Sequence, residues 1–188
     1  MKKLLILIVG MPGSGKSFAA SVIKKRFHAK TFKTGDVIRE EIRRRGLKYS
    51  PENDKKMRLW FHSGRENLIV KRLWKKVRLC KGVVVIDGLR SPKEVAMLRK
   101  LYKGKIALIK TQSSFKVRAQ RMKKRARFGK LETEKYLKER DKSETSGLVG
   151  LKLLLKKADH TIDNSRLTKN QMEKRVVLLV ESLLENAT

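Results

Sequence analysis

Short apolar runs alternate along the chain with longer amphipathic stretches, and this alternation predicts five strands separated by helices. The strands are expected at residues 4–9, 30–32, 83–86, 105–109 and 160–162. Parallel strands that are buried on both faces read as continuous apolar runs, and the segment KGVVVIDG is the clearest example. The order of the elements is typical of βα units around a parallel sheet, so the predicted fold class is α/β.

Capping residues mark the starts of three helices. Ser91-Pro92-Lys93-Glu94 combines a capping box with proline at the first helical position, and Thr168 opens the last helix with a similar box closed by Gln171. Ser50-Pro51 starts another helix. Apolar residues recur on one face of the last helix, at positions 172, 176, 179, 180, 183 and 184, which predicts that this helix docks on the sheet.

Length and composition favour one globular domain over residues 1–188. The chain is 40% hydrophobic and has no apolar run long enough to span a membrane. The run 4–9 behind Lys2 and Lys3 resembles a secretion signal, but it is short and leads into glycines without a cleavage site, so we expect a buried strand in a cytoplasmic protein. The single cysteine, Cys80, excludes an internal disulfide and a cysteine-based zinc cluster. The three histidines show no metal-ligand spacing.

Charge is the most unusual feature of the composition. Lys and Arg total 49 against 18 Asp and Glu, which gives a formal net charge of +31. A thermophilic composition would raise both signs together, so this excess instead predicts a polyanionic partner or phosphate-rich ligands. The carboxylates are also unevenly placed, because none occurs between Glu66 and Asp87 or between Glu94 and Glu132.

The segment GMPGSGKS follows the first predicted strand and carries the P-loop spacing G-x-x-x-x-G-K-[ST]. Glycines let backbone N–H groups turn toward phosphate oxygens, and the following helix adds the positive end of its dipole. Lys16 is expected to bridge the β- and γ-phosphates, and the Ser17 hydroxyl to ligate Mg²⁺. The predicted nucleotide-binding residues of this loop are Gly10, Pro12, Gly13, Ser14, Gly15, Lys16, Ser17 and Phe18.

Two carboxylates follow predicted strands, at the edge where open α/β sheets bind ligands. Asp87 ends the run VVVID and either caps the next loop or, beside a P-loop, orients Mg²⁺ through water as a Walker-B-type group. Asp36 stands in TGDVIREE, with Arg39 one turn later on the same helical face. Asp36 is either a simple N-cap or an acid that orients an acceptor hydroxyl while Arg39 holds the acceptor's phosphate.

Arginines at helical spacing form a further candidate group. They are Arg118, Arg121 and Arg125, followed by Arg127 and Arg140. Arginine grips phosphate oxygens with a planar fork, and phosphoryl transfer depends on cations that close over the transferring group. We expect residues 121–148 to form a lid that excludes water, with Arg121 and Arg125 neutralising the transferring group.

With these motifs the chain resembles the adenylate kinase and dephospho-CoA kinase group of P-loop kinases, and more closely an archaeal family related to both. The resemblance spans nearly the whole chain. It implies a three-layer α/β/α fold with a five-stranded parallel sheet, a helical acceptor-binding region at about 35–80 and a lid. TGDVIREE resembles the acceptor motif of adenylate kinases, which implies that Thr34 and Arg39 contact the acceptor phosphate. IDGLRS is similar to their DG-x-P-R segment without its proline, so Arg90 stands one place early as an acceptor contact.

ADHTIDNS resembles the ending of dephospho-CoA kinases, where the following loop lies near the adenine, and this implies base-side contacts for Asn164 and Ser165. In that family an Asp early in the second βα unit is the base for the ribose hydroxyl, and Asp36 is the matching position. An approximate match of the lid implies Arg127 and Arg140 as further lid cations. Related sequences carry acidic residues after the first lid arginines, where this chain has RARFGK.

Three hypotheses follow. The first is ATP- and Mg²⁺-dependent phosphoryl transfer to a nucleotide-like small molecule. Asp36 acting as a base predicts a hydroxyl acceptor such as dephospho-CoA, and without it a phosphate acceptor such as AMP is favoured. The second is a basic RNA- or ribosome-associated ATPase on an adenylate-kinase-like fold, which the net charge supports. The third is that the positive charge only balances a polyanion-rich or high-salt cytoplasm. The sequence sets neither the choice between ATP and GTP nor the oligomeric state.

Overall fold

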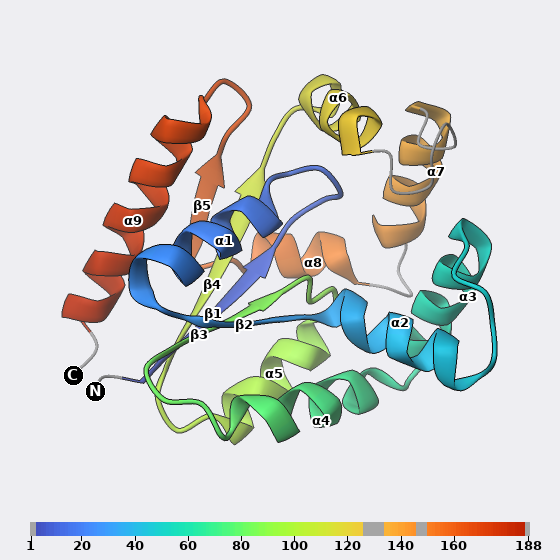
Figure 1. The fold of residues 1–188 in the computed structure, drawn as a ribbon, viewed down its shortest axis with the longest axis horizontal. Helices are drawn as coiled ribbons and strands as arrows, with labels where there is room; N and C mark the ends of the chain where they lie inside the picture. The colour runs from blue at the N-terminus through green and yellow to red at the C-terminus, as the bar shows by residue number, and fades with distance from the viewer. Residues whose placement is uncertain (1–2, 126–133, 146–149, 187–188) are drawn as a thin grey trace.

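The computed structural model describes residues 3–125, 134–145 and 150–186. Its centre is a sheet of five parallel strands in the order β2-β3-β1-β4-β5, which confirms the predicted α/β class (Figure 1). Because the strands are parallel, their carboxyl ends meet at one edge, and Ile8, Asp87 and Lys33 stand at the same level there. The strands are β1 Leu4–Val9, β2 Lys30–Lys33, β3 Val83–Asp87, β4 Lys105–Gln112 and β5 His160–Asp163.

Helices cover both faces of the sheet, as the three-layer prediction requires. One face carries α1 Lys16–Phe27 and α9 Lys169–Glu185. The other carries α4 Glu66–Val77, α5 Pro92–Leu101 and α8 Leu151–Lys156. The remaining helices gather on the side where the strands end (Figure 1). They are α2 Thr34–Arg44, α3 Pro51–His62, α6 Phe115–Arg125 and α7 Glu134–Thr145.

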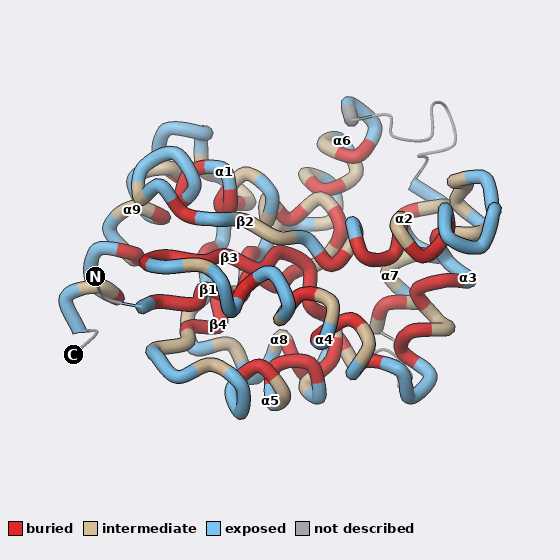
Figure 2. Tube along the Cα trace, turned by 60° about the horizontal axis from the view of Figure 1, so that its bottom comes forward, coloured by how far each residue is buried: buried red, intermediate tan, exposed pale blue. Residues whose placement is uncertain are grey.

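The central strand β1 explains why the core has two halves. All six of its residues are fully buried, and successive side chains of a strand point to opposite faces. Leu5 and Leu7 pack among the helices α4, α5 and α8, while Ile6 and Ile8 pack among α1 and α9. Burying each such side chain contributes roughly 1.5–3 kcal/mol. The tube in Figure 2 shows this buried stretch running through the middle of the molecule.

The predicted caps fix where several helices begin. Ser91 and Thr168 both form capping boxes, with Glu94 and Gln171 as their partners, and the Ser50 hydroxyl accepts a hydrogen bond from Asn53 N at 3.1 Å. No helix in the described ranges is long and apolar enough to cross a membrane. The boundaries at about 35–80 and 121–148 stay predictions, and part of the second lies outside the described residues.

Candidate active site

The loop between β1 and α1 has a backbone that only glycine can adopt at key positions. Gly15 has φ +96°, and Gly10 has φ +155°. A Cβ atom on Gly10 would come within 2.4 Å of Thr111 O. Lys16 begins α1 directly behind this loop, and its Nζ donates to Gly10 O at 2.8 Å and to Met11 O at 3.0 Å. The sequence thus builds a bare loop that leads into a helix N-terminus, the arrangement that binds phosphate.

Burial sets the electrostatic state of Lys16. It lowers the pKa of the ammonium group to about 8, an effect that Asp87 and Glu144 oppose and that Arg90 and Arg140 increase. These four groups therefore lie close enough to Lys16 to act on its charge. With its pKa lowered toward neutral pH, Lys16 gains from an arriving anion, because a nearby negative charge stabilises the protonated form.

Three polar residues outside the P-loop, Thr111, Asn164 and Arg121, hold it in place through hydrogen bonds. Ser14 Oγ lies 2.8 Å from Thr111 Oγ1, and Asn164 Nδ2 donates to Ser14 O at 2.7 Å. Arg121 Nη1 in turn donates to Asn164 Oδ1 and, at 3.4 Å, to Gly13 O. This network fixes the loop in its cradle shape before any ligand arrives.

The same network shows where two of the predicted site residues lie. The Asn164 side chain is fully buried under the loop and holds its backbone, so the contact of Asn164 with the base stays a prediction. The Arg121 guanidinium is held by the loop backbone and Asn164 and does not line the cavity beside Lys16, so its role at the transferring group stays a prediction. Ser165 is half-buried and accepts from Ser114 N at 2.9 Å, next to an open surface hollow.

Ser17 and Asp87 form a pair that suits a magnesium ion. Ser17 Oγ donates to Asp87 Oδ2 at 2.9 Å, because the register of β1 and β3 brings the end of β3 beside the P-loop. Asp87 Oδ1 is buried and has no hydrogen-bond partner among the described residues. A hydroxyl and an unpartnered carboxylate oxygen fit the preference of Mg²⁺ for oxygen ligands. The described side chains offer no cluster of three metal-binding groups, so phosphate and water would complete the shell.

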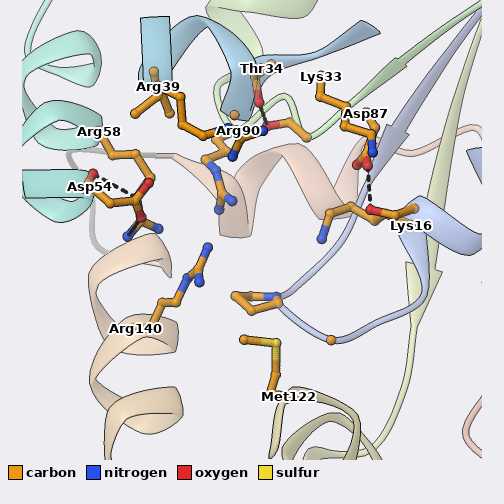
Figure 3. Close-up of a pocket in the computed structure, with 16 residues that line it drawn as sticks. Lys16, Lys33, Thr34, Arg39, Asp54, Arg58, Asp87, Arg90, Met122 and Arg140 are labelled. Carbon is orange, nitrogen blue, oxygen red and sulfur yellow. Dashed lines mark hydrogen bonds and ion pairs between the residues drawn. The ribbon is translucent and has the colours of Figure 1, made fainter. Parts of the chain in front are cut away.

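A cavity of about 780 Å³, open mouth included, lies between the P-loop, α2, α3 and α7. Six of its lining side chains are cationic and two are acidic. Arg90 and Arg140 come from opposite sides and point, with Lys16, into the same space (Figure 3). The lining residues are Pro12, Gly13, Lys16, Ser17, Lys33, Thr34, Gly35, Ile38, Arg39, Asp54, Arg58, Asp87, Gly88, Arg90, Met122 and Arg140.

One carboxylate, Glu144 near the end of α7, holds three of these arginines. Its Oε1 atom lies 2.8 Å from Arg58 Nη1 and 3.0 Å from Arg140 Nε, and Oε2 pairs with Arg90. The Glu144 side chain is 3% exposed. Burial alone would raise the pKa of Glu144, but the three guanidinium groups hold that pKa well below its usual range. Arg58 also pairs with Asp54 at 2.8 Å, so both carboxylates fix its position.

The acceptor residues predicted from α2 are only partly brought together. Thr34 is buried at the cavity wall and donates to Gly88 O at 2.7 Å, and Arg39 lines the cavity. Asp36 pairs with Arg39, but its side chain is 54% exposed and does not line the cavity. The N-cap alternative for Asp36 is wrong, because α2 begins at Thr34 and its N-cap is Lys33.

The predicted lid arginines take different positions. Arg118 is buried, pairs with Asp141 at 2.6 Å and donates to Pro12 O at 3.1 Å, which ties α6 to α7 and to the P-loop. Arg140 lines the cavity. The side chain of Arg125 and all of Arg127 lie outside the described residues, so their predicted roles stay predictions.

Sequence reasoning missed Asp54, Arg58 and Glu144. Asp54 and Arg58 are four residues apart on α3, and Arg140 and Glu144 are four apart on α7. This spacing brings opposite charges together on one helical face, and from it the two ion pairs could have been predicted. It does not reveal that the two pairs meet, because that depends on how α3 and α7 pack.

Comparisons with known proteins agree with this geometry. A family model described as an AAA domain matches residues 9–138. A UPF0200 protein of Pyrococcus horikoshii is 33% identical over 188 residues, covering 97% of this chain and 99% of that protein. The chain belongs to the UPF0200 family. The predicted membership of an archaeal P-loop family is thereby confirmed.

Solved structures place the UPF0200 chain in the P-loop kinase fold. Shikimate kinase from Acinetobacter baumannii, in complex with shikimate, matches with a TM-score of 0.65 at 15% identity, over 95% of this chain and 93% of that one. A gluconokinase from Sinorhizobium meliloti matches with a TM-score of 0.58 at 15% identity, over 96% and 93%. At such identities the likeness establishes the fold of the UPF0200 chain and confirms the three-layer prediction.

Proposed function

We propose that this UPF0200 chain is an ATP- and Mg²⁺-dependent kinase that transfers the γ-phosphoryl group to a small, phosphate-bearing, nucleotide-like acceptor. One observation carries the proposal: Lys16, Arg90 and Arg140 point into one cavity from three separate segments (Figure 3). Phosphoryl transfer asks little covalent chemistry of a protein and is accelerated by preorganised cations around the transferring group.

The donor side of the cavity is the P-loop. Backbone N–H groups around Gly13 and Gly15 and the Lys16 ammonium group would hold the β- and γ-phosphates. Ser17 and Asp87 would hold Mg²⁺, which when bound neutralises charge on the phosphates. Arg121 and Asn164 would keep the loop in its phosphate-binding shape before the nucleotide binds.

The acceptor side lies toward α2 and α3. Arg39 and Arg58 line it, and both can attract an anionic acceptor. Asp36 does not line the cavity, and Asp54 is bound by Arg58. An ionised phosphate oxygen needs no base to act as a nucleophile, whereas a hydroxyl acceptor does. These positions favour a nucleoside monophosphate such as AMP over the hydroxyl of dephospho-CoA.

The arginines held by Glu144 complete the site. Arg90 and Arg140 carry guanidinium groups that Glu144 fixes in place, so little reorganisation is needed when charge develops on the transferring group. Closing α3 and α7 over the substrates would also exclude water that otherwise hydrolyses the donor.

Phosphoryl transfer from γ-labelled ATP tests the proposal. The acceptors are AMP, other nucleoside monophosphates, dephospho-CoA, shikimate and gluconate, with and without Mg²⁺. Lys16→Ala is the inactive comparison, and Lys24→Ala, an exposed change on the same helix α1, is its matched control.

We expect a labelled nucleoside diphosphate that Lys24→Ala still forms and Lys16→Ala does not. Label on shikimate or gluconate alone would overturn the acceptor class, and label on dephospho-CoA alone would overturn the preference for a phosphate over a hydroxyl acceptor. The absence of transfer to every acceptor would overturn the kinase assignment.

A further inference from the structure

The face of the molecule formed by α4, α5 and α8 carries positive charge without exposed carboxylates. These three neighbouring helices cover one side of the sheet. Their only acidic residues, Glu66 and Glu94, are both buried. Their exposed cationic residues are Lys71, Lys75, Lys76, Lys93, Arg99, Lys100, Lys152 and Lys156. We call this surface the basic face.

Few of these charges are neutralised from elsewhere. Lys76 lies 3.3 Å from Glu40, and Arg99 lies 3.6 Å from Asp159. Exposed cations also follow α4, α5 and α8 along the chain, at Arg78, Lys81, Lys103 and Lys157. Among the described residues the basic face therefore presents a broad layer of cations, of which only Lys76 and Arg99 have an acidic partner within 4 Å.

The opposite face is less unbalanced. Helix α9 mixes lysines and arginines with Glu173, Glu181 and Glu185, and Arg26 of α1 pairs with Glu173 at 2.8 Å. Burial sharpens the contrast, because six carboxylates but only two cationic side chains are buried among the described residues. Six of the acids thus lie inside, Asp54 and Glu144 among them beside arginines of the cavity, and add no exposed carboxylate to the surface.

We propose that the basic face binds the phosphodiester backbone of nucleic acid. Packed helices lie roughly 8–10 Å apart, so three of them make a surface about as wide as a duplex, along which phosphates recur every ~1.7 Å. Lysines that neutralise these phosphates release counterions, which gives affinity that falls with salt. The positive charge of the basic face is therefore complementary to the negative charge of a nucleic-acid backbone.

Two features of the basic face select nucleic acid over a lipid surface and predict its mode of binding. The helices turn their apolar sides into the core, and the exposed Leu79, Leu101 and Leu153 lie one on each of three separate segments. A helix that lies in a membrane presents a continuous apolar side outward instead. Trp74 and Tyr102 pack edge to face with ring centroids 6.5 Å apart and are partly buried, so they offer no flat surface for base stacking, and we expect binding to be independent of sequence.

Fluorescence anisotropy of a short labelled duplex of mixed sequence, prepared as RNA and as DNA, tests the proposal. One variant reverses a charge on each helix of the basic face, with Lys71→Glu, Lys100→Glu and Lys152→Glu. The control variant reverses three exposed lysines of α1 and α9, with Lys25→Glu, Lys169→Glu and Lys174→Glu. Both change the net charge equally, none of the six residues lines the cavity, and thermal melting checks that both fold.

The wild type is expected to bind duplex with an affinity that falls steeply between about 50 and 200 mM salt. The basic-face variant is expected to lose roughly tenfold or more in affinity and about three units of salt slope, and the control variant less than about threefold in affinity. Equal losses in both variants would overturn the proposal, because charge anywhere on the surface would then suffice. Binding to phosphatidylglycerol vesicles but not to duplex would also overturn it.

Discussion

Replacing Glu144 by glutamine removes the buried negative charge that the guanidinium groups of Arg58, Arg90 and Arg140 share. At an effective dielectric constant of about 20 and charge separations of about 4 Å, each attraction is worth roughly 4 kcal/mol. Desolvation and the mutual repulsion of the arginines cancel much of the sum. Breaking a buried ion pair from one side costs about 3–5 kcal/mol, and we expect Glu144→Gln to lower the free energy of unfolding by that amount.

Urea unfolding followed by circular dichroism measures this loss. Glu139→Gln is the matched control, because Glu139 lies on the same helix α7 but is exposed, and exposed charges contribute about 0–1 kcal/mol. A Glu144→Gln loss below about 1 kcal/mol would refute the reasoning that burial makes this carboxylate an organising charge.

Three further changes test other parts of the site. Because burial lowers the pKa of Lys16 to about 8 and the protonated form binds phosphate, affinity for ADP measured by calorimetry should fall as the pH rises through about 8, and Lys16→Met should be weak and insensitive to pH over that range; an equal decline in both proteins would show that another group titrates. Asp87→Asn should remove most of the gain in ADP affinity that Mg²⁺ gives to the wild type, and an unchanged gain would place the ion elsewhere. Asp36→Asn should change the rate of phosphoryl transfer less than about threefold, whereas a loss of 10² or more would restore Asp36 as a base.

The strands were predictable because burial in a parallel sheet leaves a local mark on the sequence. The main departure is β4, which continues three residues past the predicted end through Lys110, Thr111 and Gln112. These residues are polar or aligned with β5, where Lys110 pairs with Thr161 and Gln112 with Asp163. Pairing with β5 holds these residues in the sheet, and the local sequence has no apolar run that would predict this extension of β4.

The P-loop was predictable for a similar reason, since its conformation depends on glycines close together in the chain. The roles of the arginines were not. Arg121 and Arg140 carry the same charge, yet one supports the P-loop and the other lines the cavity. The position of each arginine depends on how α6 and α7 pack. Arg121 is held by Asn164, which lies far from it in the sequence, and Arg140 is held by Glu144 on the buried side of α7.

Titration with Mg·ADP in the presence and absence of aluminium fluoride tests most directly whether Lys16, Arg90 and Arg140 form a cage for a transferring phosphoryl group. The planar fluoride mimics that group, and analogues of a transition state bind at least about 10²-fold more tightly when the site is built for it. We predict such a gain for the wild type, and its loss in Arg140→Met with the affinity for Mg·ADP retained. A wild type that binds both forms equally would contradict the assignment of this cavity to phosphoryl transfer.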